Sequence, residues 1–383
     1  MKIVVTTGDK IFPIKGGGAL RTTKIAQELR SQRHEVTLLA PSDEKNILNG
    51  IKVVPLPEVA QEKSILFGPI LFTIKSFLAL LRNRGNVDLI ISHNSIAAMP
   101  SLIFSKIFRK VFVLDITDLQ TEYFRENKKG FVWHILTHLM ITIEMWLIRN
   151  SAKVIVVSKI MKEILVKRGI DPRRIFVVYD GVETKKFLLP KKKQTHPLII
   201  HHGSINPHDG VESIPYSAVE VLKKYPTSKF YIVGSGNRVE TVKEIAKRSG
   251  LDSSFVFTGW KPYEEIKNYL QIADIGLITR PNTLANNTVL TLKLLEYWAS
   301  GTAPVAARLK GIQEISEEDE NVLFFTPGST IELANCIIRL IENPTLLERI
   351  QEKGRETAKR FEWDDLAKEV VRLSITNHTR RLK

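Results

Sequence analysis

Glu296 is the residue whose type and position best suit binding chemistry, because it is a single carboxylate in an apolar run. The run, residues 290–300 (LTLKLLEYWAS), is typical of a helix, and residues 286–288 (NNT) before it offer capping side chains. A helix start presents free N–H groups and the positive end of its dipole, which favours a diphosphate. One turn farther on, a carboxylate can accept hydrogen bonds from both hydroxyls of a vicinal diol, such as a ribose. The alternative is a solvated helix residue without a ligand.

A glycine triplet, Gly16, Gly17 and Gly18, precedes another helical segment near the N-terminus. Because glycine leaves the backbone bare, this loop can bring N–H groups against an anion at the helix start. The triplet has neither the GxGxxG spacing of a dinucleotide site nor the GK[ST] of a P-loop. On its own it indicates a flexible turn as readily as a phosphate-binding loop.

Small residues also follow three apolar runs in the second half of the chain. Gly203 and Ser204 end PLIIHHGS, Gly234 lies in KFYIVGSG, and Gly259 and Trp260 end SFVFTGW. The carboxyl ends of parallel strands are where a doubly wound sheet binds its ligand. There, Trp260 is suited either to lie against a flat base or to cap the edge of the sheet.

The pattern that must position these residues is an alternation of short β-branched runs with longer helical segments. The first half contains KIVVT, HEVTLLA, IKVVPL, VDLIISHN, KVFVLDI and AKVIVVS, and the second half contains PLIIHHG, KFYIVGSG, SFVFTGW, IGLITR, APVAA and NVLFF. Near-continuous apolar strands separated by helices predict parallel sheets covered on both faces. The sequence therefore predicts an α/β protein with two doubly wound domains.

The length of 383 residues also suits two domains. We predict an N-terminal domain over residues 1–187, a linker over 188–197, where proline and lysines interrupt the pattern, and a C-terminal domain over 198–360. The last helix, predicted over 361–383, has no strand to lead to. The single cysteine, Cys336, excludes an internal disulfide and fits a reducing compartment. KIVVTTGD at the start is typical of a strand rather than a secretory signal, so we expect a cytoplasmic protein.

The net charge of +15 lies entirely in the first half of the chain. Residues 1–195 hold 32 Lys+Arg and 17 Asp+Glu, whereas residues 196–383 hold 24 of each. Such a surplus indicates an anionic partner, namely nucleic acid, anionic lipid or a phosphorylated substrate, or else a solvated face with no partner. The basic half has no recognisable nucleic-acid-reading motif, so nucleic acid is not expected as a partner.

Two long apolar stretches, residues 64–84 and 131–150, admit more than one interpretation. Lys75 interrupts the first and Glu144 lies in the second, so neither has the ~20 uncharged apolar residues of a bilayer crossing. Both remain open as helices that lie on a membrane surface or as helices packed within the protein.

The motifs, taken in order, resemble family 4 of the retaining glycosyltransferases, enzymes of the GT-B fold, over nearly the whole chain. The glycine loop is followed by VSKIMKEIL, VVYDGVETKKF, HHGSI, FYIVGSG, FTGW, IADIGLI, KLLEYWASGTAPVAA, GIQEI and FEWDDLAKEV. The resemblance implies two Rossmann-like domains, with the nucleotide-sugar donor held mainly by the second domain and the acceptor by the first. It also implies that the last helix, from Phe361, crosses back to the first domain.

The resemblance assigns roles to several donor-side residues. Glu296 matches the family glutamate that binds the donor ribose. Gly17 and Gly18 match the glycine loop that faces the diphosphate, and Gly259 with Trp260 matches the region that holds the base.

On the acceptor side, TDLQTE (residues 117–122) resembles the RDLWPE loop of members that act on lipid-linked acceptors. This match implies that Asp118 and Glu122 lie near the acceptor. The histidine that the family commonly has in the catalytic cleft is not evident, and its place falls in VLDITDL, residues 113–119.

The donor side also departs from the family pattern. Thr288 stands where a first glutamate usually contacts the transferred sugar. Ser204 and Asp209 align with an arginine and a lysine that usually bind the diphosphate. Lys293, near the helix start at Thr291, is expected to supply positive charge instead.

These observations together predict a hexosyltransferase that moves a sugar from a UDP- or GDP-sugar to a lipid-linked or glycan acceptor with retention of configuration. We expect it to lie peripherally on the inner face of the cell membrane, drawn there by the basic first domain, and to need no cofactor or metal besides the donor. We predict two catalytic residues, Asp118 and Lys293, and ten donor-binding residues: Gly16, Gly17, Gly18, Gly203, Ser204, Gly259, Trp260, Thr288, Thr291 and Glu296. The alternatives are a catalytically degenerate GT-B nucleotide-sugar-binding subunit, a GT-B nucleotide-sugar epimerase, or a transferase with a small soluble acceptor.

Overall fold

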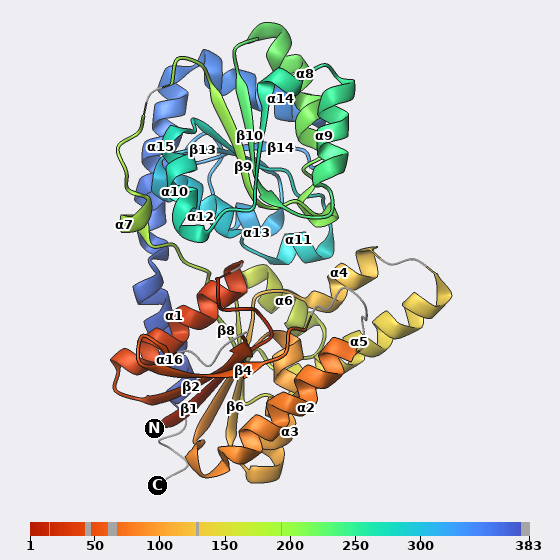
Figure 1. Cartoon of the computed structure of the whole chain (residues 1–383), viewed down its shortest axis with the longest axis vertical. Coiled ribbons are helices and arrows are strands. Elements are labelled where there is room, and N and C mark those ends of the chain that lie inside the picture. Colours follow the sequence, from red (N-terminus) through yellow and green to blue (C-terminus); the bar gives the residue numbers. More distant parts are fainter. Residues whose placement is uncertain (15, 43–46, 60–66, 128–129, 193, 377–383) are drawn as a thin grey trace. The chain divides into compact units, whose positions relative to one another are not determined.

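A computed structural model describes residues 1–14, 16–42, 47–59, 67–127, 130–192 and 194–376 (Figure 1). The chain forms two compact units, Met1–Asp180 with Trp363–Lys383, and Gly181–Glu362. The start of the predicted apolar stretch, residues 64–66, and Lys193 of the predicted linker lie outside the described residues.

The first unit is built on an eight-stranded sheet whose order is β3-β4-β2-β1-β5-β6-β7-β8. The strands are β1 (Lys2–Thr7), β2 (Glu35–Pro41), β3 (Ile47–Leu48), β4 (Ile51–Leu56), β5 (Leu89–His93), β6 (Val111–Ile116), β7 (Lys153–Val156) and β8 (Ile175–Val177). All neighbouring strands pair in parallel except β3, which pairs antiparallel with β4. All the residues of β5 and nearly all those of β1 and β6 are buried, as expected for a sheet covered on both faces.

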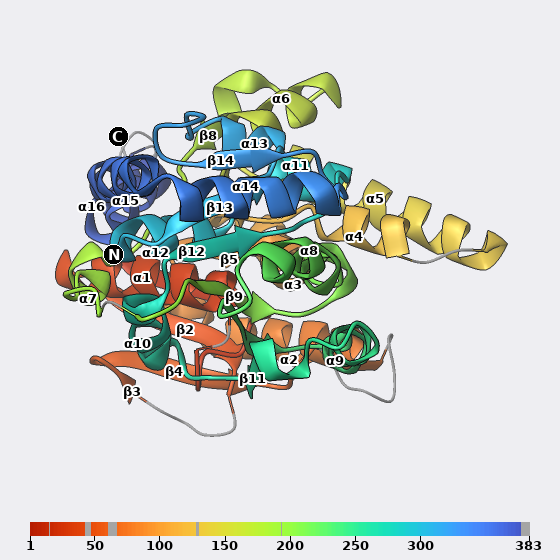
Figure 2. The same cartoon turned by 90° about the horizontal axis from the view of Figure 1, so that it is seen from above.

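Seven helices of the described residues belong to this unit, and α4 and α5 project to one side of its sheet (Figures 1 and 2). They are α1 (Gly17–Ser31), α2 (Phe67–Arg82), α3 (Asn94–Phe108), α4 (Gln120–Asn127), α5 (Phe131–Asn150), α6 (Lys159–Lys167) and α16 (Trp363–Ile375). The C-terminal helix α16 packs against α1, and Val370 and Val371 join Ile25 and Leu29 of α1 in one core over β1. The C-terminal helix is therefore part of the first unit.

The second unit is built on a six-stranded parallel sheet of order β11-β10-β9-β12-β13-β14. Its strands are β9 (Leu198–Ser204), β10 (Lys229–Ser235), β11 (Phe255–Gly259), β12 (Ile275–Ile278), β13 (Ala303–Ala307) and β14 (Leu323–Phe325). Its helices are α7 (Thr184–Phe187), α8 (Ser213–Lys224), α9 (Val239–Arg248), α10 (Tyr263–Ile272), α11 (Leu284–Thr288), α12 (Leu292–Ser300), α13 (Lys310–Gln313), α14 (Thr330–Glu342) and α15 (Pro344–Ala358).

The prediction of an α/β protein with two doubly wound, mostly parallel sheets is confirmed. The strands β3 and β8 were not predicted, because two- and three-residue strands are too short to show a pattern. Residues 188–197 lie in the second unit, which begins at Gly181. At this boundary the Val182 N–H donates to the Phe361 carbonyl over 2.8 Å, which pairs the entry and exit segments of the second unit.

Each sheet has one place where the strand order reverses. In the first unit β1 lies between β2 and β5, and in the second unit β9 lies between β10 and β12. In open α/β sheets, ligands bind beyond the carboxyl ends of the strands at this switch point. The residues after β1, β5, β9 and β12 are therefore the first candidates for functional sites.

Candidate active site

At the switch point of the second unit, β9 ends at a backbone that only glycine can form. Gly203 has a φ of +104°, and a Cβ added there would lie 2.9 Å from Cε of Lys293. A Cβ on Gly234, at the end of β10, would lie 1.8 Å from the Gly203 carbonyl oxygen. The two strand ends therefore touch, and the Lys293 side chain lies directly against them.

Lys293 belongs to a buried cluster of charges centred on Asp209. Its Nζ lies 3.2 Å from Oδ1 of Asp209, and the Ser204 hydroxyl donates to Oδ2 over 2.7 Å. Nη2 of Arg280 lies 3.9 Å from the same carboxylate. Burial alone would raise the pKa of Asp209, but Lys293 and then Arg280 outweigh it and hold this pKa well below its usual value. The cluster thus holds two cations against one carboxylate at the end of β9.

This geometry gives a structural role to the departures from the family pattern. Ser204 and Asp209, which align with the usual diphosphate-binding cations, instead hold Lys293 in place. Arg280 was not predicted from the sequence, although it directly follows the strand run IGLIT and thus stands at a strand end. Positive charge is therefore retained at this switch point by different residues.

Glu296 is buried, with 4% of the residue exposed, so the alternative of a solvated helix residue is wrong. Burial raises the pKa of its carboxyl to about 7, although Tyr263 and Lys293 act in the opposite direction. One Glu296 oxygen lies 3.3 Å from Nε2 of His202, the residue before Gly203. Burial, with the charge of Lys293, lowers the pKa of His202 well below its usual value, so this imidazole is neutral.

Helix α12 carries both Lys293 and Glu296, which are three residues apart and therefore share a face. Two large side chains fix the helix to the sheet and to the loop before β14. The Tyr297 hydroxyl donates to the Ile200 carbonyl over 3.3 Å, and the Trp298 indole N–H donates to a loop carbonyl over 2.7 Å. The helix start at Thr291 has no side-chain cap, so the first N–H groups depend on other partners.

The remaining predicted donor residues lie at different places in the second unit. Thr288 ends α11, and its hydroxyl donates to the Ala285 carbonyl over 2.8 Å. Gly259, with a φ of +71°, ends the edge strand β11, and the exposed Trp260 follows it. Because β10 separates β11 from β9, the role of Trp260 at a nucleotide base stays a prediction.

In the first unit, the glycine loop presses against two residues that were not predicted from the sequence. Gly16 has a φ of +84° and α1 begins at Gly17. A Cβ on Gly18 would lie 2.2 Å from Oδ2 of Asp9 and 2.6 Å from Nε2 of His93. Asp9 follows β1 and His93 ends β5, so both lie at the switch point of this sheet. Glycine at position 18 is what permits this close approach.

A chain of charged contacts runs inward from this point. The His93 imidazole lies 3.5 Å from Oδ2 of Asp9 and 3.0 Å from Oδ2 of Asp115, which ion-pairs with the buried Arg21. Arg21 also lies 3.1 Å from Asp180. Burial alone would lower the pKa of His93, but Asp115 and then Asp9 raise it above its usual value. The chain therefore favours a charged imidazole beside Asp9, whose carboxyl side chain is 37% exposed.

Of the two predicted acceptor-side residues, Asp118 lies next to this chain of contacts, whereas Glu122 pairs with other residues. Asp118 accepts a hydrogen bond from the Thr117 hydroxyl over 3.2 Å, and this hydroxyl lies 3.4 Å from Nε2 of His93. A histidine thus lies beside residues 113–119, where the place of the family histidine falls. Glu122 is buried and ion-pairs with Arg168 over 2.6 Å, a contact that fixes α4. The sequence signals for Asp9 and His93 are their positions at strand ends.

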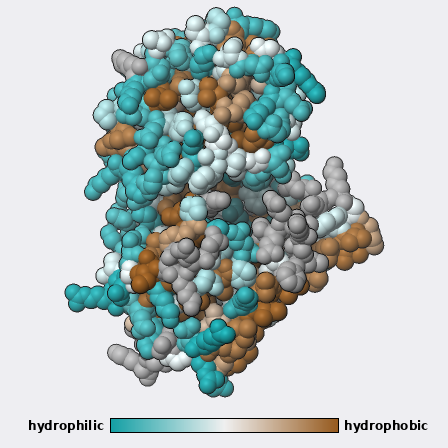
Figure 3. Space-filling view, in the orientation of Figure 1, coloured by the Kyte–Doolittle hydropathy of each residue, from teal (hydrophilic) through white to brown (hydrophobic). Residues whose placement is uncertain are grey.

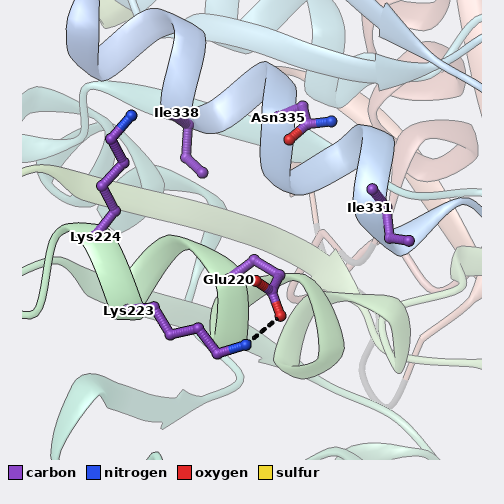
Figure 4. A pocket seen from close by; sticks show the side chains of 6 residues that line it. All are labelled: Glu220, Lys223, Lys224, Ile331, Asn335 and Ile338. Carbon is purple, nitrogen blue, oxygen red and sulfur yellow. Dashed lines mark hydrogen bonds and ion pairs between the residues drawn. The ribbon is translucent and has the colours of Figure 1, made fainter.

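Within the described part of the chain, no group of three or more His, Cys, Asp or Glu residues is placed to hold a metal ion. An open pocket between α8 and α14 is lined by Glu220, Lys223, Lys224, Ile331, Asn335 and Ile338 (Figure 4). Lys223 is paired with Glu220 over 2.7 Å, and the pocket shares no residue with the two switch points.

Two doubly wound, mostly parallel units in one chain are the architecture of the GT-B glycosyltransferases. Two family models match overlapping parts of the chain: Glycosyltransferase Family 4 over residues 15–186 and Glycosyl transferases group 1 over residues 183–357. Together the two models cover residues 15–357. The chain therefore belongs to the family 4, group 1 glycosyltransferases and is a glycosyltransferase, as the sequence predicted.

Similar proteins cover nearly the whole chain. The phosphatidyl-myo-inositol mannosyltransferase of Mycobacterium tuberculosis is 23% identical over 95% of this chain and 94% of its own length. Sucrose-phosphate synthase from Thermosynechococcus elongatus has the same fold, with a TM-score of 0.82 and 16% identity over 100% of this chain and 99% of that structure. Anabaena HepE in complex with UDP-glucose has a TM-score of 0.77 and 18% identity over 96% of this chain and 98% of that structure.

Proposed function

We propose that this enzyme transfers a sugar from a nucleoside diphosphate sugar to a lipid-linked or glycan acceptor with retention of configuration. The observation that carries the proposal is the placement of Glu296, Lys293 and Arg280 beside one switch point of a parallel sheet. A buried carboxylate and two cations at neighbouring positions match the two polar parts of such a donor, its ribose and its diphosphate.

On the donor side, Glu296 accepts hydrogen bonds from the ribose 2′ and 3′ hydroxyls. Lys293, Arg280 and the uncapped N–H groups at the start of α12 bind the diphosphate. Anabaena HepE, solved with UDP-glucose, supports a UDP-sugar as the first donor class to test. GDP-sugars remain the second, because base and sugar depend on pocket shape rather than fold.

In the reaction, the bond between the anomeric carbon and the phosphate oxygen breaks, and the acceptor oxygen bonds to the same face of that carbon. The leaving phosphate takes the acceptor's proton, so no protein carboxylate pair is required. Lys293 and Arg280 stabilise the charge that develops on the diphosphate, which is electrostatic catalysis by preorganised groups. Asp118 and the Asp9–His93 pair position the acceptor hydroxyl from the first unit.

The acceptor is lipid-linked, and the enzyme acts at the cytoplasmic face of the cell membrane as a peripheral protein. Support comes from the +15 charge confined to the first half of the chain and from a relative named for a phosphatidyl-myo-inositol acceptor. A transferase with a glycan or small soluble acceptor is the alternative within the same chemistry.

The test is a donor panel read by thermal shift, followed by product analysis. A ligand that binds only the folded state raises the melting temperature, so one class among UDP-, GDP- and ADP-sugars is expected to stand out. That donor is then incubated with membrane lipid extract and with soluble glycans, and the product's anomeric configuration is determined by NMR. An inverted product contradicts the retention of configuration, and transfer only to soluble glycans contradicts the lipid-linked acceptor in favour of the glycan alternative.

A further inference from the structure

One side of the first unit carries an exposed apolar surface built from three neighbouring helices. Ten of the sixteen exposed large hydrophobic residues among the described residues lie on α2, α3 and α5, each with 38–80% of its area exposed. This surface, called here the α2–α3–α5 surface, consists of Ile70, Ile74, Leu78, Ile103, Ile107, Phe131, Val132, Ile135, Leu139 and Trp146. Figure 3 shows the corresponding apolar band along the side of the first unit, where α3 contacts both α2 and α5.

The spacing of these residues gives each helix one outward apolar stripe. Ile70, Ile74 and Leu78 follow one another at intervals of four along α2, as do Phe131, Ile135 and Leu139 along α5. Helix α5 projects beyond the sheet of the first unit (Figure 1). A monomeric soluble protein seldom gathers so many apolar side chains on one face without a partner for them.

Helix α5 has the length and hydropathy of a membrane span, but its contacts fix it to the protein. Only 28% of its 18-residue apolar window is buried, so it is not a core helix. Glu144 in its C-terminal half accepts hydrogen bonds from Ser95 over 2.6 Å and from Thr121 over 2.5 Å. A transmembrane orientation would break these buried contacts, whereas a helix lying along a surface keeps them.

The charges around the apolar stripes indicate which kind of partner binds this surface. Exposed cations flank the apolar residues on all three helices: Lys75, Arg82, Lys106 and Arg149. The sequences of α2 and α3 contain no carboxylate, and the only one in α5 is the buried Glu144. A second copy of this surface would place cations against cations, whereas an anionic bilayer would complement them. The exposed indole of Trp146 also suits a membrane interface.

We propose that the α2–α3–α5 surface inserts into the headgroup region of an anionic lipid bilayer, with α5 lying in the membrane plane. The inference deepens the proposed function, on which it rests for the location of the acceptor. It assigns binding chiefly to the apolar side chains, with the cations adding attraction to anionic lipid.

The test uses the full-length chain and sedimentation with vesicles of phosphatidylcholine, alone or with phosphatidylglycerol. The wild type is expected to prefer the anionic vesicles and to stay partly bound at high salt, which screens the cations only. Two double variants, Ile135→Glu with Leu139→Glu and Ile74→Glu with Leu78→Glu, are each expected to weaken binding by about tenfold or more. Ile331→Glu is the control, because Ile331 is 68% exposed on α14 of the other unit.

The outcomes separate this inference from the donor assignment. Circular dichroism and the thermal shift by the donor establish that each variant is folded and still binds nucleotide sugar. Unchanged vesicle binding in both double variants overturns the inference, as does light scattering that shows a dimer dispersed by them. If the protein binds vesicles but transfers no sugar to any lipid, the α2–α3–α5 surface is still supported as a membrane-binding surface. That result contradicts only the proposed lipid-linked acceptor.

Discussion

Nζ of Lys293 lies 3.2 Å from Oδ1 of Asp209, and this pair is buried at the end of β9. Asp209 stands where the family usually has a lysine. Its carboxylate is the counter-charge for Lys293, which α12 brings to this position. Burial lowers the pKa of Lys293, and Asp209 limits that fall. The pair keeps a charged ammonium where desolvation alone would favour the neutral amine.

Replacing Asp209 by Asn is expected to destabilise the protein strongly, because it leaves Lys293 buried without its carboxylate. Breaking a buried ion pair from one side typically costs about 3–5 kcal/mol of unfolding free energy. Urea unfolding of Asp209→Asn measures the loss, with Asp252→Asn, at an exposed position, as the matched control. Equal stability of Asp209→Asn and the wild type would contradict the structural role of this pair.

Arg280→Ala and Lys293→Ala are expected to weaken binding of the nucleoside diphosphate while leaving the nucleoside itself little affected. Each lost charged contact to phosphate should reduce affinity roughly 10- to 100-fold. Calorimetry with the diphosphate and the matching nucleoside separates the two effects, and Arg248→Ala, on an exposed part of α9, is the control. Parallel losses for both ligands would place these cations elsewhere than at the diphosphate.

Donor affinity is expected to rise as the pH increases through about 7, because burial raises the pKa of Glu296 to about 7 and only its ionised form accepts both ribose hydroxyls. Binding at pH 7 should therefore release protons, measurable by calorimetry in buffers of different ionisation enthalpy. A nucleotide sugar is the suitable ligand, since its diphosphate does not titrate in this range. Glu296→Gln should flatten the pH profile of donor affinity. If the profile is unchanged in this variant, a group other than Glu296 causes the pH dependence.

The same carboxyl makes a prediction for stability in the absence of donor. Because the folded-state pKa of Glu296 is raised above its unfolded value, its contribution to stability is present at low pH and lost as the pH rises towards 7. Glu296→Gln should therefore gain stability relative to the wild type between pH 5 and pH 8. Urea unfolding at a series of pH values measures this difference, and a constant difference across the range is the contrary result.

His93→Asn is expected to lower the transfer rate while leaving donor binding intact, because His93 lies in the first unit beside Asp9. The raised pKa of His93, held by Asp115 and Asp9 against burial and Arg21, predicts an imidazole that stays protonated above its usual pKa. NMR titration of the imidazole nitrogens reports this directly, with His34→Asn as the control for transfer. A His93 resonance that titrates below its usual pKa would contradict the proposed contact chain.

The sequence predicted the sheets and the helices around residues 131–150 and 290–300, because long apolar periodicity survives in any context. It also singled out Glu296. It did not reveal Arg280 or His93, since their partners lie far along the chain: Arg280 and Asp209 are brought together only by the pairing of β9 with β12. Nor could it show that Asp209 and Lys293 neutralise each other, because this depends on the contact of α12 with a strand end.

The central claim is that Glu296 binds the donor ribose, and a double comparison tests it most directly. Binding of the nucleoside diphosphate selected by the donor panel, and of its 2′,3′-dideoxy analogue, is measured by calorimetry for the wild type and Glu296→Ala. We predict that the variant loses about 100-fold or more in affinity for the natural nucleotide, the equivalent of two charge-assisted hydrogen bonds. It should lose little for the analogue. Equal losses for both ligands, or no loss for the natural one, would contradict the claim.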